Sequence, residues 1–145
     1  MGRIMAIDFG RKRSGIAVTD ELQIIATGLT TVASHELLQF LKDYVTKEKV
    51  DCFVVGEPKQ MNNQPSESLS YIKPFVSRLK QEFPLIPVEM MDERFTSKMA
   101  FQTMIDGGLK KKDRRDKELV DTISATIILQ SYMEQKGHQT NRNKL

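Results

Sequence analysis

The residues best suited to chemistry stand near the start of the chain, where one acid is followed by a glycine and by cations. A short apolar run, Ile4–Ile7, ends at Asp8, and Gly10 begins the turn that follows. The cations of this turn are Arg11, Lys12 and Arg13. A carboxylate is an oxygen ligand that Mg²⁺ prefers, and neighbouring cations can hold phosphate oxygens. The pattern therefore predicts a metal or phosphate site or, equally, an ordinary hairpin with a polar turn.

Two more acids, Asp92 and Glu93, directly follow a predicted strand and precede Arg94. In open sheets, ligand sites form beyond the carboxyl ends of the strands. Asp8 and Glu93 both stand just beyond such ends, so converging carboxylates could build a divalent-metal site for phosphoryl transfer. Acids in this position can also simply favour the N-terminus of the following helix.

A further acid, Asp121, lies in a predicted helix whose centre, Ile123–Leu129, is apolar on nearly every side. Helical spacing places Ala125, Ile128 and Tyr132 on the face of this acid. Burial of an unpaired carboxylate is costly, so Asp121 needs a partner. That partner is a salt-bridging arginine or lysine, which the helix position favours, or a metal shared with other acids.

The composition is typical of one soluble domain. The 145 residues are 39% hydrophobic and 28% charged, which suits a sizeable core. No apolar run approaches the roughly 20 residues that span a bilayer, and the N-terminus has no signal-peptide pattern, so we expect a cytoplasmic protein without membrane partners. Cys52 sits in an apolar run and is expected to be a buried structural thiol. His35 and His138 lack metal-ligand spacing.

The net charge of +3 is concentrated in one segment. Residues 110–117 hold six cations and two acids, a local charge of +4. Such a cluster is usually a solvated loop, but it is also the electrostatic footprint of a protein that binds phosphate backbones. We therefore predict nucleic-acid contacts from this segment, from the turn cations and from Arg94. From the segment we single out Lys110, Lys111, Lys112, Arg114 and Arg115, and its sixth cation is Lys117.

Residue patterns predict strands that alternate with helices. The expected strands are Arg3–Phe9, Ser14–Asp20, Ile24–Val32, Cys52–Gly56 and Ile86–Met91, and the expected helices are His35–Glu48, Glu67–Glu82, Ser97–Asp106 and Lys117–Gln135. We expect Ser34 to cap the first helix and Pro74 to kink or break the second. The order predicts an α/β fold with a five-stranded mixed sheet, three antiparallel strands and then two parallel ones, and helices on both faces. Residues 1–136 then form one domain and 137–145 a flexible polar tail.

Four motifs in the chain together resemble the YqgF/RuvX family. They are A-I-D-F-G-R-K-R-S-G-I-A, V-V-G-E-P, D-E-R-F-T-S and V-D-T-I-S-A-T-I-I-L-Q-S-Y, which occur in this order between Arg3 and Tyr132. The resemblance implies a ribonuclease H-like fold and a nuclease that processes the 5′ end of pre-16S rRNA in ribosome biogenesis. The family is also described as Holliday junction resolvases of DNA recombination and repair, so branched DNA is the alternative substrate.

Carried over residue by residue, the three catalytic acids of the family fall on Asp8, Glu93 and Asp121. The resemblance implies that these carboxylates hold Mg²⁺ or Mn²⁺ for hydrolysis of a phosphodiester. Asp92 and Glu57 are additional candidates. Glu57 stands where we expect an apolar residue in many relatives, and it is either a fourth carboxylate or, as we favour, a polar loop residue.

Other classes of function fit the chain less well. Actin-like ATPases begin with a similar acid–glycine loop, but they need two such domains, and 145 residues supply only one. The D-F-G of the first motif is not a protein-kinase motif, because no Gly-rich loop or H-R-D motif accompanies it. A non-catalytic nucleic-acid-binding module remains the third alternative, although the three acids favour an enzyme. The expected partner is precursor rRNA or branched DNA, and the expected assembly is a monomer or a homodimer.

Overall fold

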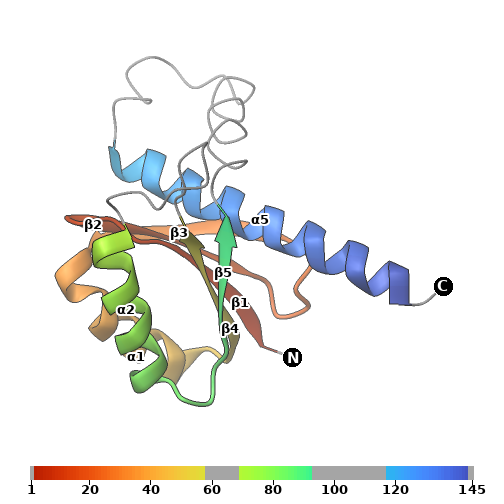
Figure 1. Cartoon of the computed structure of the whole chain (residues 1–145), viewed down its shortest axis with the longest axis horizontal. Helices are drawn as coiled ribbons and strands as arrows, with labels where there is room; N and C mark the ends of the chain where they lie inside the picture. The colour runs from red at the N-terminus through yellow and green to blue at the C-terminus, as the bar shows by residue number, and fades with distance from the viewer. Residues whose placement is uncertain (1, 58–68, 93–116, 144–145) are drawn as a thin grey trace.

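Five strands form one mixed sheet in the computed structural model, which describes residues 2–57, 69–92 and 117–143 (Figure 1). The strands are β1 (Arg3–Asp8), β2 (Arg13–Thr19), β3 (Ala26–Ala33), β4 (Val50–Glu57) and β5 (Val88–Asp92). Their order across the sheet is β3-β2-β1-β4-β5. Antiparallel pairing joins β1 to β2 and β2 to β3, whereas β1, β4 and β5 run parallel. The predicted mixed sheet is confirmed.

Helices cover both faces of this sheet. A short 3-10 turn, η1 (Ser34–Glu36), leads into α1 (Leu37–Lys47), and α1 lies with α2 (Leu69–Glu82) on one face. The long helix α5 (Lys117–Asn143) crosses the other face and projects past the sheet at its C-terminal end (Figure 1). Helices on both faces were predicted from the element order, and the structure confirms them.

Side-chain alternation along β1 separates two hydrophobic cores. Met5 and Ile7 are fully buried toward α1 and α2, whereas Ile4 and Ala6 are buried toward α5. Successive side chains of a strand point to opposite faces, so this pattern assigns a face to every residue of β1. The buried α5 residues of the second core are Ala125, Ile128, Leu129 and Tyr132. The predicted apolar face of the last helix is therefore confirmed.

Three local expectations are wrong. Ser34 caps no helix, because its side chain is engaged with Gly10 and Ser14, and the residue before η1 is Ala33, which makes no side-chain cap bond. The helix α2 continues through Pro74, so the predicted break is wrong, while the alternative of a kink stays a prediction. The helix α5 continues to Asn143, past the end predicted at Gln135, so the predicted tail boundary is not a helix end. The predicted helix Ser97–Asp106 lies outside the described residues.

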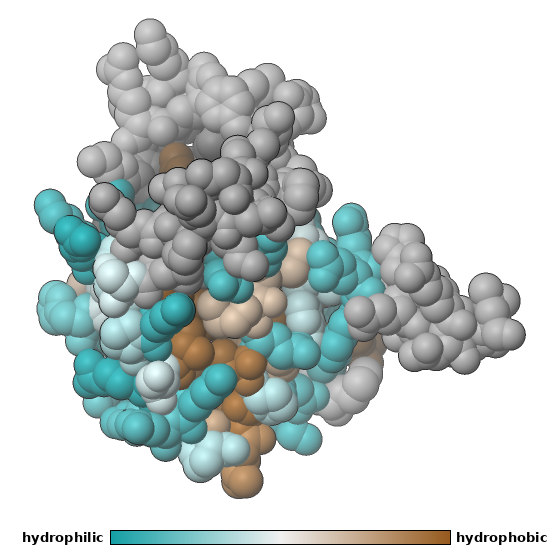
Figure 2. Space-filling view, viewed as in Figure 1, coloured by the Kyte–Doolittle hydropathy of each residue, from teal (hydrophilic) through white to brown (hydrophobic). Residues whose placement is uncertain are grey.

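The surface is mostly polar on the side that carries α2 and β5, with one apolar strip between polar side chains (Figure 2). Leu85, in the link between these two elements, is 94% exposed. Among the described residues, no helix has the length and apolar composition that crossing a membrane requires.

Candidate active site

Asp8 and Asp121 both adjoin Gly15 at one end of the sheet, on the face that α5 covers. Asp8 ends β1, and its register partner on β2 is Gly15. Alternation places Asp8 on the face of Ile4 and Ala6, beneath α5. Gly15 approaches the helix backbone so closely that an added Cβ would overlap the carbonyl group of Asp121. The absence of a side chain at Gly15 therefore lets α5 lie against β2 and brings the two acids to neighbouring positions.

Asp121 is paired with the last cation of the β1–β2 turn. The Nε of Arg13 donates a hydrogen bond of 2.6 Å to Oδ2 of Asp121. Arg13 and Gly15 are two residues apart on β2, so both point toward α5. The two side chains are 33% and 24% exposed, so solvent screens the pair and limits its contribution to stability to about 1 kcal/mol or less. Of the two kinds of partner expected for Asp121, the structure shows the arginine.

Hydrogen bonds hold the β1–β2 turn against the end of β3. The buried hydroxyl of Ser14 pairs with that of Ser34 at 2.8 Å, and the Ser34 hydroxyl donates to the carbonyl of Gly10 at 2.5 Å. The backbone N–H of Ser34 donates to the carbonyl of Lys12 at 3.0 Å. These contacts fix the backbone of the turn, so its cations are presented from a defined position next to Asp8.

The other two described acids near this edge of the sheet point elsewhere. Glu57 and Asp92 are register partners on β4 and β5. Because Met91 is buried beneath α5, alternation turns Asp92 to the opposite face. Glu57 lines a cavity of about 320 Å³ together with Lys73 of α2 and Met90 of β5. The structure therefore separates these two acids from the face that holds Asp8 and Asp121.

The remaining predicted site residues lie outside the described residues. They are Glu93, Arg94, Lys110, Lys111, Lys112, Arg114 and Arg115. Within residues 2–57, 69–92 and 117–143, no three acids, histidines or cysteines are grouped closely enough to hold a metal ion. Asp8 and Asp121 nevertheless offer carboxylate oxygens, the donors that suit Mg²⁺ or Mn²⁺, so they fit part of such a ligand set.

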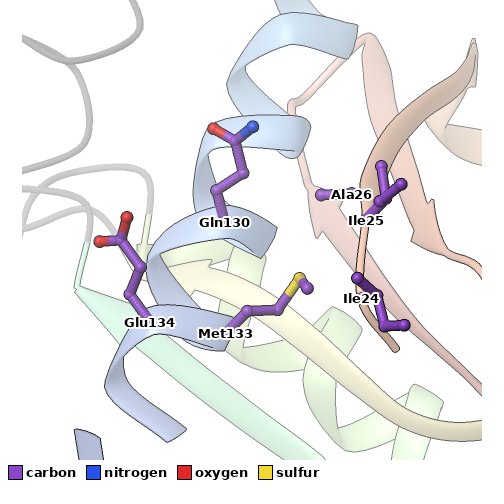
Figure 3. Close-up of a pocket in the computed structure, with 6 residues that line it drawn as sticks. All are labelled: Ile24, Ile25, Ala26, Gln130, Met133 and Glu134. Carbon is purple, nitrogen blue, oxygen red and sulfur yellow. The ribbon is translucent and has the colours of Figure 1, made fainter. Parts of the chain in front are cut away.

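A cavity of about 590 Å³ lies further along α5, between this helix and the start of β3 (Figure 3). Ile24 and Ile25 contribute apolar surface and are 64% and 63% exposed, and Met133 points toward Ile24. The polar side chains of its lining, Gln130 and Glu134, include a carboxylate, and the lining contains no cation. This composition does not suit a phosphate group, so the cavity is not the candidate active site.

The single cysteine is structural, as predicted. Cys52 is buried on β4, with its thiol near Glu89 and the hydroxyl of Tyr132. Burial, together with the nearby Glu89 carboxylate, raises the pKa of the Cys52 thiol to about 12. A thiol with this pKa stays protonated at neutral pH and is a poor nucleophile.

Sequence reasoning missed the importance of Gly15 and of the serine pair. A glycine inside a strand is a signal for close approach of another backbone, and that signal was available. By contrast, no local pattern links Ser14 to Ser34, because their contact depends on how β2 and β3 pair in three dimensions.

The sequence matches proteins of one described family along most of its length. A family model described as "RuvX: Holliday junction resolvase" matches residues 2–135. A relative from Phocaeicola vulgatus is 65% identical over 138 residues, which cover 95% of this chain and 99% of the relative. A relative from Porphyromonas gingivalis is 59% identical over 134 residues, which cover 92% and 97%. Both relatives carry the name "Putative pre-16S rRNA nuclease".

Among solved structures, the RuvC of T. thermophilus in complex with a Holliday junction substrate is similar, with a TM-score of 0.55. The alignment covers 92% of this chain and 97% of that chain at 15% sequence identity. At this identity the similarity concerns the fold alone, and it confirms the expected ribonuclease H-like architecture.

Proposed function

The chain belongs to the RuvX family, and from this membership we propose that it is a metal-dependent nuclease that processes the 5′ end of pre-16S rRNA. The observation that carries the proposal concerns Gly15, which is the register partner of Asp8 and lies against the backbone of Asp121 at the carboxyl end of β1. Ligand sites of open sheets form at this end of the strands. The name of the relatives supports the choice of substrate.

Asp8 and Asp121 are the acids that would hold a divalent ion, with Glu93 as the third by its place in the family motif. Asp92 is a weaker candidate than Glu93, because alternation along β5 turns it away from the other two acids. A bound Mg²⁺ or Mn²⁺ would supply an activated water and stabilise charge on the leaving oxygen. The carboxylates fix where that chemistry occurs by holding their oxygens at the sheet edge.

Arg13 orients Asp121 and is also placed to contact substrate. A guanidinium carries five N–H donors, and Arg13 donates to Asp121 through its Nε. The remaining donors can hold a phosphate oxygen at the site. Arg11 and Lys12 are exposed on the same fixed turn, so they would bind neighbouring phosphates. Arg94 and the cations of residues 110–115 would extend this contact surface.

The test is a cleavage assay with purified protein, with and without Mg²⁺ or Mn²⁺, on a pre-16S rRNA fragment, a four-way DNA junction and single strands. We expect metal-dependent cleavage of the rRNA fragment and loss of that cleavage in Asp8→Asn. Asp43→Asn is the matched control, because Asp43 is an exposed acid on α1. Exclusive cleavage of the junction would replace the RNA proposal with the resolvase activity that the family description names. Cleavage by Asp8→Asn at the wild-type rate would contradict the proposed site.

A further inference from the structure

A cavity of about 220 Å³ adjoins the basic turn on the face of α1 and α2. Its lining combines the rings of Phe9, Tyr71 and Phe75 with the side chains of His35 and Arg78. Cavities that enclose a drug-sized ligand are about 300–1,000 Å³, so this one suits a smaller planar group. Aromatic rings beside cations are the combination that proteins use to bind a base together with its phosphate.

The aromatic rings of this cavity are held in a fixed arrangement. Phe9 stacks on Phe75 with ring centroids 4.2 Å apart and planes 7° from parallel, and Tyr71 lies 6.0 Å from Phe9. Phe75 is buried and anchors the cluster in the core. Phe9 and Tyr71 are half-buried, and both rings line the cavity wall.

The charge around the cavity is positive. Arg78 belongs to the lining, which contains no acid. The guanidinium of Arg11 lies 5.2 Å from the centre of the Tyr71 ring, which links the basic turn to the cavity. The exposed carboxylate of Glu36 is 3.8 Å from His35 but does not line the cavity. An anionic group that carries a ring therefore complements this site.

The cavity is also next to the candidate active site. Phe9 directly follows Asp8 at the carboxyl end of β1, and alternation places the two side chains on opposite faces of the sheet. A nucleotide chain that crosses this end of β1 can therefore present a phosphate to Asp8 and an adjacent base to Phe9.

We propose that this cavity binds one unpaired base of single-stranded nucleic acid that flanks the cleaved phosphate. Tyr71 and Phe9 provide the stacking surface, and Arg78 and Arg11 hold the phosphate of that nucleotide. The location beside the cleaved bond rests on the proposed function, whereas binding of the base does not. A paired base cannot enter, because its Watson–Crick partner holds it within the duplex.

The experiment measures binding to Asp8→Asn protein, which cannot cut under the proposed function, with a short RNA that carries one 2-aminopurine. Stacking quenches the fluorescence of this base, so we expect quenching on binding for single-stranded RNA and DNA and none for the matching duplexes. Tyr71→Leu should lose the quenching and weaken binding roughly 5- to 150-fold, the range measured when a stacking ring is removed. Tyr71→Phe keeps the ring and should retain both properties. Equal quenching by duplex and single strand would overturn the proposal.

Arg78→Gln should reduce the dependence of affinity on salt by the equivalent of about one phosphate contact. Lys80→Gln is the matched control, because Lys80 is an exposed cation on the same helix outside the cavity lining. Thermal melts check that each variant folds. Wild-type affinity and quenching in folded Tyr71→Leu would refute the base site even if the enzyme cuts RNA. Quenching by the Asp8→Asn protein, combined with no cleavage by the wild-type protein, would refute the proposed function and leave the base site standing.

Discussion

Replacement of Gly15 by alanine tests whether close contact between β2 and α5 assembles the site. The added Cβ would meet three backbone atoms of the helix. It would lie closer than 3.0 Å to the carbonyl oxygen and carbonyl carbon of Asp121, and 3.0 Å from the backbone nitrogen of Thr122. Ordinary contact begins near 3.4 Å, so even the nitrogen must retreat by 0.4 Å. Backbone atoms cannot rotate away as a flexible side chain can, so α5 has to move by on the order of 1 Å.

Such a shift has two expected consequences. Overpacking of this kind lowers the free energy of unfolding by about 1–3 kcal/mol. Displacement of Asp121 from Asp8 by about 1 Å lowers the cleavage rate on the order of 100-fold, because catalytic geometry tolerates little misplacement. A thermal or urea melt measures the first effect, and single-turnover cleavage of the rRNA fragment at a temperature where the variant is folded measures the second.

Gly28→Ala is the matched control, since Gly28 on β3 also faces α5. Its Cβ would meet the side chains of Thr122, with Cγ2 at 2.5 Å, and Thr126, with Oγ1 at 3.2 Å, which can adjust. We expect a loss of stability with a much smaller loss of activity. Wild-type stability and activity in Gly15→Ala would refute the reasoning, because the contact would then have no consequence.

Three more predictions concern charges. Asp121→Asn should abolish metal-dependent cleavage while lowering stability by about 1 kcal/mol or less, because its ion pair with Arg13 is partly exposed. Arg13→Gln breaks the same ion pair but should leave cleavage dependent on metal. If the two variants behave equally in thermal melts and metal titrations, Asp121 has a structural role only. Replacing Arg11 and Lys12 by glutamine should weaken binding to all nucleic-acid sequences alike and flatten its salt dependence, because phosphate contacts carry no sequence information; an unchanged salt slope in a binding titration would place nucleic acid elsewhere. The native state holds the proton of Cys52 more tightly than the unfolded chain does, because folding raises the pKa of the thiol from the ordinary 9.0 to about 12. The free energy of unfolding should therefore fall between pH 9.0 and pH 12, with a slope of up to about 1.4 kcal/mol per pH unit. Urea melts across this range should show a shallower slope for Cys52→Ala than for wild type.

The sequence was most informative where the local pattern matched the fold. Alternation and apolar runs correctly predicted all five strands and the buried face of α5, because burial there repeats with the period of the element. Ser34 shows the limit of such reasoning. It has the residue type of a helix cap and stands before a helix, yet its hydroxyl bonds to Gly10 across the sheet edge. The hydrogen bond from Ser34 to Gly10, 24 positions away, replaces the helix-capping hydrogen bond, and the sequence around Ser34 cannot show which of the two forms.

The candidate site was predicted in part for the same reason. Asp8 and Asp121 could be singled out because each acid adjoins an apolar segment, but their approach depends on the packing of α5 against Gly15. The partner of Asp121 illustrates the difference. A cation could be expected from burial alone, whereas its identity, Arg13, depends on how α5 packs against β2.

The distance in sequence between Asp8 and Asp121 has a consequence for synthesis on the ribosome. The four strands of residues 3–57 can pair with one another as soon as they emerge, but the face later covered by α5, including Ala6, Ala17 and Val54, stays open until the last helix has been made. The packing of α5 against β1 and β2 is slow to form, because contacts between segments far apart in the chain require long loops to close first. The nascent chain therefore lacks Asp121 and its neighbours until α5 has been made. Under the proposed function, cleavage would depend on the same docking of α5 that closes the second core.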